Sequence, residues 1–319
     1  MTQEGDYMEK ILKAKQALQQ VIYGKETEID LLFIAIIAGG HILLESAPGT
    51  GKTKLAKSFA KVMHGDFNRV QFTPDVLPSD VTGIRYFNPK YETFELREGP
   101  VVTNVLLADE INRATPKTQS SLLEVMEEYQ VTIDGETVTV PQPFIVLATQ
   151  NPVESNYGTF PLPEAQLDRF LFKINLGYPT REEEKEILQN YRLQDPYNEL
   201  EVILEPEDIL ELRRQAKEVV MTDIVTDYLL DIVHETRTHS EIELGISPRG
   251  VLALMRAAQA KALVEEREYI TPQDIKTLAS YIFPHRLILT MEGAIKKTAE
   301  DIVRQILNQI PVPVENVMN

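Results

Sequence analysis

The sequence predicts an α/β fold, in which helices cover both faces of a parallel sheet, followed by a small all-α domain. Three apolar runs, at residues 42–44, 104–108 and 144–149, are typical of parallel strands that are buried on both faces. Polar or glycine-containing segments follow these runs, as expected where ligands meet the carboxyl ends of such strands. After about residue 196, helical spacing with proline near the helix starts replaces the apolar runs. We therefore predict a three-layer core over residues 1–195 and a helical domain over residues 196–319.

The composition limits the classes of partner. The 319 residues are 43% hydrophobic and 25% charged, with a formal net charge of −17 and no cysteine. A charge of this sign argues against a broad surface for nucleic acid or for an anionic membrane, and the absence of cysteine excludes thiolate chemistry and disulfides. The first ten residues are acidic and polar, unlike a signal peptide, and the longest apolar stretch, residues 31–44, is shorter than the ~20 residues that span a bilayer. We expect a cytoplasmic protein with no direct membrane insertion.

A phosphate-binding loop is predicted directly after the first apolar run. The loop reads Ser46-Ala47-Pro48-Gly49-Thr50-Gly51-Lys52-Thr53, and apolar residues at helical spacing follow it over residues 54–63. Its glycines let backbone N–H groups point at phosphate oxygens, and the helix N-terminus adds partial positive charge. We expect Lys52 to reach the β- and γ-phosphates and the Thr53 hydroxyl to hold Mg²⁺. Ser46 replaces the first glycine of the full pattern, so we expect a slightly different path into the loop.

The segments around this loop have helical and extended patterns. Helices are predicted over residues 7–20 and 26–38, and a strand over residues 69–73. Residues 82–99 read as an exposed excursion or hairpin that carries the aromatic residues Tyr86, Phe87, Tyr91 and Phe94. These aromatic side chains either contact a partner or form a small cluster of their own.

Two carboxylates, Asp109 and Glu110, follow the apolar run at residues 104–108. Carboxylates at the end of a buried strand are costly unless they have partners or a function, and open α/β sheets bind ligands at this edge. We expect Asp109 to complete the Mg²⁺ shell with Thr53, and Glu110 to polarise the water that attacks the γ-phosphate.

A helix start at Thr115-Pro116 precedes a second hairpin. Residues 129–133 and 136–140 alternate in polarity around Asp134-Gly135, which is the strongest short hairpin signal. If Ile133 pairs with Glu136, one face carries Tyr129, Val131, Ile133, Val138 and Val140. This apolar face must pack on its own domain or on a neighbouring subunit.

Polar residues also follow the third apolar run. Asn151, within Gln150-Asn151-Pro152, can hydrogen-bond a γ-phosphate or the attacking water if it lies beside Asp109 and Glu110. Arg169 follows soon after. It either forms a salt bridge with a nearby carboxylate such as Asp168 or Glu164, or acts as an arginine finger at a neighbour's active site.

The C-terminal part has helix starts at Glu205-Pro206, Ser247-Pro248 and Thr271-Pro272. Arg249 lies in the first turn after Ser247-Pro248, where a cation opposes the helix dipole. It is either an exposed arginine without a role or one that faces an anion such as an ATP phosphate.

Together these motifs resemble the MoxR family of AAA+ ATPases. The matching residues are 43–53, 106–114, 148–152, 162–170 and 247–250. The resemblance implies a P-loop core, a helical lid, and a homo-oligomeric ring, commonly hexameric, with ATP and Mg²⁺ at subunit interfaces. It also implies inserts at about 82–98 and 129–141.

The resemblance further implies roles for individual residues. Asn151 is similar to the sensor-1 residue, Arg249 to the sensor-2 residue and Arg169 to the arginine finger, with Arg113 a second possible interface contact. Ile22 and Gly24 would lie near adenine. Family members are thought to remodel or mature protein clients, often with partners that carry a von Willebrand factor A domain.

The first functional hypothesis is therefore an ATP-hydrolysing ring with a chaperone-like role. A nucleic-acid motor is a second hypothesis. The negative net charge argues against it, as does the lack of Lys or Arg from residue 129 to residue 140. A nucleotide-dependent binding switch with little turnover is a third, which Ser46 makes conceivable.

Overall fold

A computed structural model describes residues 3–151, 159–192 and 194–313 of the chain. At its centre lies a five-stranded sheet with the strand order β2-β5-β8-β1-β9, and every adjacent pair is parallel. The strands are β1 (Ile42–Ser46), β2 (Phe67–Gln71), β5 (Val105–Asp109), β8 (Ile145–Gln150) and β9 (Phe172–Leu176). This sheet confirms the predicted parallel α/β core.

Alternate residues of the strands enter two separate cores, one on each face of the sheet. Ile42 and Leu44 join a core with the helices α1 (Gln3–Gln19), α2 (Glu26–Ala38) and α3 (Lys52–Val62). Leu43 points to the opposite face, where it joins a core with α5 (Pro116–Glu128). The result is the predicted three-layer arrangement, with the P-loop between strand β1 and α3.

Helix α2 has apolar side chains all round and is buried along most of its length. Gly39, in the left-handed conformation at φ 71°, ends it. Among the described residues, none of the helices is long and apolar enough to cross a membrane.

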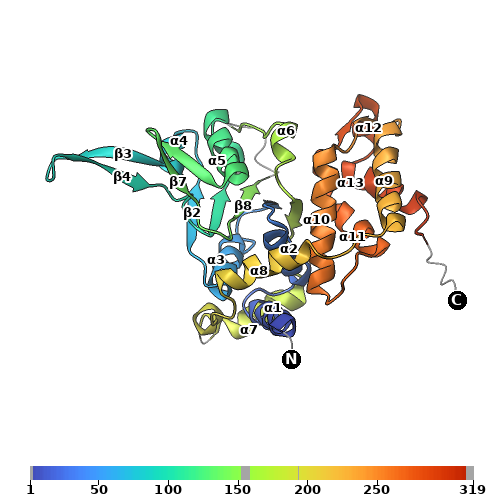
Figure 1. The fold of residues 1–319 in the computed structure, drawn as a ribbon, viewed down its shortest axis with the longest axis horizontal. Helices are drawn as coiled ribbons and strands as arrows, with labels where there is room; N and C mark the ends of the chain where they lie inside the picture. The colour runs from blue at the N-terminus through green and yellow to red at the C-terminus, as the bar shows by residue number, and fades with distance from the viewer. Residues whose placement is uncertain (1–2, 152–158, 193, 314–319) are drawn as a thin grey trace.

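Two hairpins extend from the core. After α4 (Pro78–Thr82), strands β3 (Gly83–Asn88) and β4 (Thr93–Glu98) form an arm that projects from the body of the molecule (Figure 1). Its four aromatic side chains are 41–63% exposed, so they do not form a buried cluster, although Phe87 and Phe94 make an edge contact at 5.4 Å.

The second hairpin packs on its own domain. Strands β6 (Gln130–Ile133) and β7 (Glu136–Thr139) have the predicted register, with Ile133 opposite Glu136. The side chains of Val131, Ile133 and Val140 are buried in the same core as α5. The apolar face is therefore covered within the subunit.

The C-terminal part is mainly helical. Figure 1 shows its last helices as a body beside the sheet domain. The helices and short 3₁₀ turns outside the sheet layers are η1 (Ile111–Arg113), α6 (Glu164–Leu167), α7 (Arg181–Asn190), η2 (Pro196–Glu199), α8 (Pro206–Ala216), α9 (Asp223–Thr238), α10 (Pro248–Val264), α11 (Pro272–Ile282), η3 (Pro284–Arg286), α12 (Met291–Lys296) and α13 (Ala299–Gln309). A small antiparallel pair, β10 (Ile242–Leu244) and β11 (Ile288–Leu289), adds strands that the all-α expectation did not include.

The segment after the proposed boundary at residue 196 packs against the sheet domain. The backbone N–H groups of Ile203 and Leu204 both donate to the Val62 carbonyl at 2.9 Å. Arg213 of α8 donates to the carbonyl of Ile36 at 2.8 Å, at the end of α2. The boundary remains a prediction, because α8 bridges the two parts of the chain.

Candidate active site

The loop between β1 and α3 forms an open cradle. Gly49 and Gly51 have φ values of 82° and 86°, which strain any residue with a Cβ. A Cβ built on either glycine would meet nothing within 4 Å, so the cradle has room for a ligand. The Thr50 hydroxyl donates to the Ala47 carbonyl at 3.1 Å and closes the turn that contains Pro48. These are the features that a phosphate group needs in a loop that leads into a helix.

Ser46 ends strand β1 and does not need the freedom of glycine. It pairs with Leu176 of β9, is 2% exposed, and is not among the residues with positive φ. The first left-handed residue of the loop is Gly49. Serine is therefore compatible with this position, and its hydroxyl has no hydrogen-bond partner among the described residues.

Asp109 lies at the same edge of the sheet as the loop. Its Oδ1 is 3.6 Å from Lys52 Nζ and accepts a hydrogen bond from the Thr149 hydroxyl at 2.6 Å. Its Oδ2 accepts from Arg69 Nη2 at 2.7 Å. Burial opposes ionisation of Asp109, but the Thr149 hydroxyl, Arg69 and Lys52 together hold the pKa of this carboxyl below its usual value. The carboxylate is therefore charged at neutral pH.

Glu110 is held in a strained position next to Asp109. Its φ of 57° is left-handed, which is uncommon for a residue with a side chain. Its N–H donates to the Thr149 hydroxyl at 2.9 Å, and its carboxylate Oε2 lies 3.0 Å from Nε of Arg113. The expected interface residue Arg113 thus contacts Glu110 within the subunit.

Asn151 lies at the same edge. Ala108 pairs with Ala148 and Glu45 pairs with Gln150, so Asn151 follows β8 between the ends of β5 and β1. Its side chain is only 6% exposed. The structure therefore brings Asp109, Glu110 and Asn151 to the edge where Lys52 and Thr53 begin α3.

The residues at this edge fit Mg²⁺ bound together with phosphate. Thr53 supplies a hydroxyl and Asp109 a carboxylate, both hard oxygen ligands, and Lys52 next to Thr53 reaches Asp109. No group of three His, Cys, Asp or Glu residues suited to a metal occurs in the described part of the chain. A magnesium ion that takes its remaining ligands from phosphates and water needs no such group.

An apolar cavity of about 280 Å³ adjoins the loop. Its lining includes Ile22, Gly49 and Gly51, together with Ile187 of α7 and Tyr191 directly after that helix. An apolar space beside a phosphate cradle suits a nucleobase. Gly24 lies nearby, in the wall of a neighbouring cavity, with φ 64° and its Cα against the Glu183 carboxylate of α7.

Arg169 and Arg249 lie at the opposite edge of the sheet. They line a cavity of about 330 Å³ together with Gly40 and His41, which precede β1, whereas the phosphate loop follows β1. Five residues of strand separate these ends by roughly 17 Å at ~3.3 Å per residue. Among the described residues, Arg169 forms its salt bridge with Glu127 and not with Asp168 or Glu164, which were named as examples of a nearby carboxylate.

Both arginines instead bind Glu127, at the end of α5. Nη2 of Arg169 is 3.2 Å from Oε2, and Nη2 of Arg249 is 3.1 Å from Oε1. The anion opposite Arg249 in the isolated subunit is therefore a carboxylate of its own chain.

Sequence reasoning missed several contacts of the site. Arg69 and Thr149 bind Asp109, although β2 and β8 are far apart in the sequence. Their position in the strands next to β5 follows only from the strand order. Lys54, directly after the loop, binds Asp195 and lies 4.8 Å from the ring centre of Tyr191. No local sequence pattern marks these long-range pairs.

Comparison with known proteins identifies the family. The profile of the ATPase family associated with various cellular activities (AAA) matches residues 41–172, and that of the AAA lid domain matches residues 234–306. The chain is 49% identical to the protein YeaC of Bacillus subtilis over 304 residues, covering 95% of each chain. It is 41% identical to Chaperone MoxR1 of Mycobacterium tuberculosis over 311 residues, covering 94% of this chain and 82% of that one.

A solved structure agrees with the profiles. The crystal structure of a candidate ATPase from Cytophaga hutchinsonii superposes with a TM-score of 0.91 at 40% identity, covering 98% of this chain and 97% of that one. The P-loop, the carboxylates after β5 and the helical lid thus occur together in a chain with MoxR relatives along most of its length. The chain belongs to the MoxR family of AAA+ ATPases.

Proposed function

We propose that this chain hydrolyses ATP to ADP and phosphate at a site shared between two copies in a ring, and that it uses this reaction to remodel, assemble or mature partner proteins. The observation that carries the proposal is the division of the site between two edges of the sheet. Lys52, Asp109 and Glu110 lie at one edge, and Arg169 and Arg249 lie at the other. A head-to-tail contact between copies brings the two sets together.

In the proposed reaction, the residues at the first edge bind the ATP and activate the attacking water. The glycine loop and Lys52 hold the phosphates, and the apolar cavity at Ile22 holds the adenine. Glu110 accepts the proton of the attacking water, and Asn151 orients that water or the γ-phosphate. Mg²⁺ held by Thr53 and Asp109 would neutralise charge on the phosphates.

The neighbouring copy completes the site. Negative charge spreads over the transferred phosphoryl group, and a guanidinium stabilises it best when it binds two oxygens at once. Arg169 and Arg249 have side chains that are 29% and 46% exposed, so both are accessible to another chain. We propose that both leave Glu127 to bind this charge, and that the ring is a hexamer.

The proposed biological role is inferred from the names of the relatives and from the family resemblance. MoxR1 is named a chaperone, and the family resemblance adds partners with a von Willebrand factor A domain. The exposed aromatic side chains of the β3–β4 arm are a surface on which protein clients can bind. A cytoplasmic location is part of this proposal.

A phosphate-release assay tests the reaction. The wild-type protein should release phosphate from ATP, and Glu110→Gln should bind ATP yet turn it over ~10² times more slowly, because general-base assistance is lost. Absence of turnover in the wild type, with ATP bound, would favour the binding switch instead. Stimulation by DNA that falls with salt would favour the nucleic-acid motor.

A mixing experiment tests the sharing of the site. Lys52→Ala removes the phosphate grip, and Arg169→Ala removes the arginine, so each variant alone should be nearly inactive. Mixed rings should recover activity, because a Lys52→Ala copy gives its Arg169 to the ATP held by an Arg169→Ala copy. No recovery at any mixing ratio would mean that the arginine does not act between copies.

A further inference from the structure

The 3₁₀ turn η3 of the lid forms hydrogen bonds with the segment that carries Arg169. Nε of Arg286 donates to Asp168 Oδ1 at 2.7 Å. Its Nη2 donates to the carbonyls of Asp168 and Phe170 at 3.2 and 2.7 Å, and its Nη1 donates to the Leu171 carbonyl at 3.3 Å. One guanidinium thus binds the residues on both sides of Arg169. His285 adds a contact from Nε2 to the Phe170 carbonyl at 2.9 Å.

This contact is buried and its geometry is tightly constrained. The side chain of Arg286 is 2% exposed. Burial lowers the pKa of Arg286 to about 10, despite the neighbouring Asp168 carboxylate, so the guanidinium remains charged at neutral pH. A buried charge needs its full set of partners. Asp168 and the carbonyls of the Arg169 segment supply most of them, and the Ile282 carbonyl at the end of α11 supplies another. Because the loss of any of these hydrogen bonds would leave the buried guanidinium less well paired, the Arg169 segment is held in one position.

The same contact reaches the helix that carries Arg249. A Cβ on Gly250 would lie 3.1 Å from Arg286 Cδ, so the first turn of α10 packs directly on the Arg286 stem. Ser247, the N-cap of α10, donates to the second oxygen of Asp168 at 3.5 Å. Asp168 and Arg286 therefore join the two segments from which Arg169 and Arg249 extend.

We propose that Arg286 is a positioning residue that presents Arg169 and Arg249 as a pair to the phosphate bound by the next copy. Arg286 does not touch the nucleotide; it sets the distance and direction of the two arginines that do. This inference rests on the proposed function, in which those arginines act between copies.

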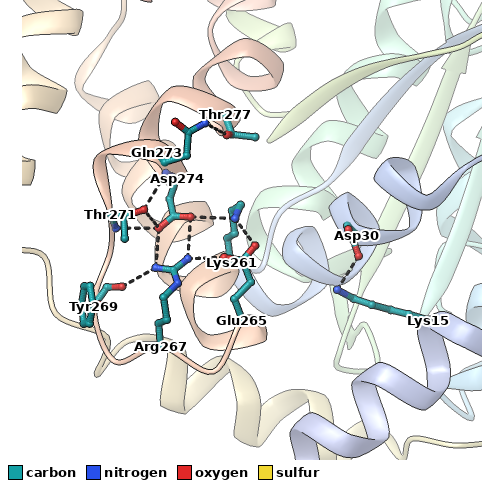
Figure 2. A network of polar contacts seen from close by, with 10 residues as sticks. All are labelled: Lys15, Asp30, Lys261, Glu265, Arg267, Tyr269, Thr271, Gln273, Asp274 and Thr277. Carbon is teal, nitrogen blue, oxygen red and sulfur yellow. Dashed lines mark hydrogen bonds and ion pairs between the residues drawn. The ribbon is translucent and has the colours of Figure 1, made fainter. Parts of the chain in front are cut away.

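The lid contains a matched control. Arg267 also binds a buried aspartate, with its two nitrogens 2.8 and 2.9 Å from Asp274, and Lys261 and Glu265 join the network (Figure 2). These partners lie in α10, in α11 and in the connection between them. Loss of Arg267 should therefore weaken the lid without moving the Arg169 segment.

The experiment compares Arg286→Gln with Arg267→Gln. For Arg286→Gln we expect kcat to fall about tenfold or more, as when a positioned charge is lost, while ATP affinity stays within about twofold. Addition of Lys52→Ala copies, which carry intact arginines, should restore turnover at the ATP bound by Arg286→Gln copies. Arg267→Gln should lower the Tm but keep kcat near the wild-type value.

Several outcomes would overturn the inference. These are an unchanged kcat in Arg286→Gln, a loss of ATP affinity, or no recovery on mixing in a folded variant. If Arg286→Gln does not fold, Arg286→Lys replaces it in the same measurements. Lysine keeps the positive charge beside Asp168 but lacks the planar guanidinium that spans the carbonyls. It should fold with lowered kcat, and a wild-type kcat would count against the inference.

Amide hydrogen exchange separates this inference from the proposed function. In the nucleotide-free protein, the amides of residues 169–172 should exchange about tenfold faster in Arg286→Gln or Arg286→Lys than in the wild type or Arg267→Gln. This result does not depend on hydrolysis. A wild type without turnover would refute the proposed function, whereas unchanged exchange would refute the positioning role.

Discussion

Arg169 and Arg249 bind opposite oxygens of the same Glu127 carboxylate, although one precedes β9 and the other begins α10. This carboxylate competes with any phosphate that the two arginines are to bind. Exposed ion pairs contribute about 0–1 kcal/mol each, so the competition is weak enough to be reversed when a copy docks.

We therefore predict that Glu127→Gln raises turnover by roughly two- to fivefold, the effect of losing about 0.5–1 kcal/mol of competing interaction. Phosphate release at saturating ATP and high protein concentration measures it. Glu124→Gln, one turn earlier in α5, serves as a control that should have no effect. A drop in turnover like that of Arg169→Ala would instead mean that Glu127 orients the arginines.

Gly24→Ala should weaken ATP binding. The residue has φ 64°, which strains a residue with a Cβ, and a Cβ there would lie 2.0 Å from the Glu183 carboxylate carbon. The Glu183 carboxylate must therefore leave its place at the start of α7, where it accepts a hydrogen bond from the Thr180 N–H at 2.7 Å. Because Ile187 of α7 and Tyr191 directly after it line the apolar cavity, we expect about tenfold weaker ATP binding, or about 1.4 kcal/mol, with kcat within twofold. Titration with a fluorescent ATP analogue checks this. Gly177→Ala, where a Cβ meets nothing within 4 Å, should bind normally.

Asp109→Asn should increase the Mg²⁺ requirement. The amide keeps the shape of the side chain but loses the charge that attracts the ion. We expect the Mg²⁺ concentration for half-maximal turnover to rise about tenfold or more, and chelation of Mg²⁺ to abolish turnover in the wild type. Asp75→Asn, at an exposed position, is the control. An unchanged Mg²⁺ dependence would remove Asp109 from the metal site.

The folded state should lose stability as the pH falls from about 6.5 towards 4. Burial lowers the pKa of His41 from 6.5 to about 4, despite its contact with the Met126 carbonyl, and burial also lowers the pKa of His285. Below pH 6.5 the unfolded chain binds protons at these residues that the folded chain does not, so acid favours unfolding. His41 alone accounts for about 2 kcal/mol between pH 7.5 and pH 5.

Urea unfolding at pH 7.5 and pH 5 measures this loss. In His41→Gln the difference between the two pH values should shrink, even though the variant is less stable at both. His64→Gln should not reduce it, because Glu205 raises the pKa of that exposed histidine. An equal pH dependence in His41→Gln and the wild type would contradict the prediction.

The local parts of this protein could be predicted from short stretches of sequence. The loop from Ser46 to Thr53, the buried strands and the caps of the helices are set by composition and spacing over a few residues, and the structure has them at the predicted places. The register at Ile133 and Glu136 was also predictable, because a two-residue Asp-Gly turn allows few pairings. Asp109 and Glu110 could be proposed as site residues, because a carboxylate at the end of a buried strand is costly unless it has a partner or a function.

The contacts between these parts depend on the packing of distant segments and could not be predicted locally. The strand order β2-β5-β8-β1-β9 places Arg69 and Thr149 on Asp109, and no local pattern encodes that order. Because β9 runs parallel to β1, Arg169 before β9 lies at the edge opposite Lys52, which follows β1. The packing of α10 and η3 joins Asp168 to Arg286. Contacts between distant segments depend on the packing of whole layers, whereas periodicity and turn chemistry act only between near neighbours in the chain.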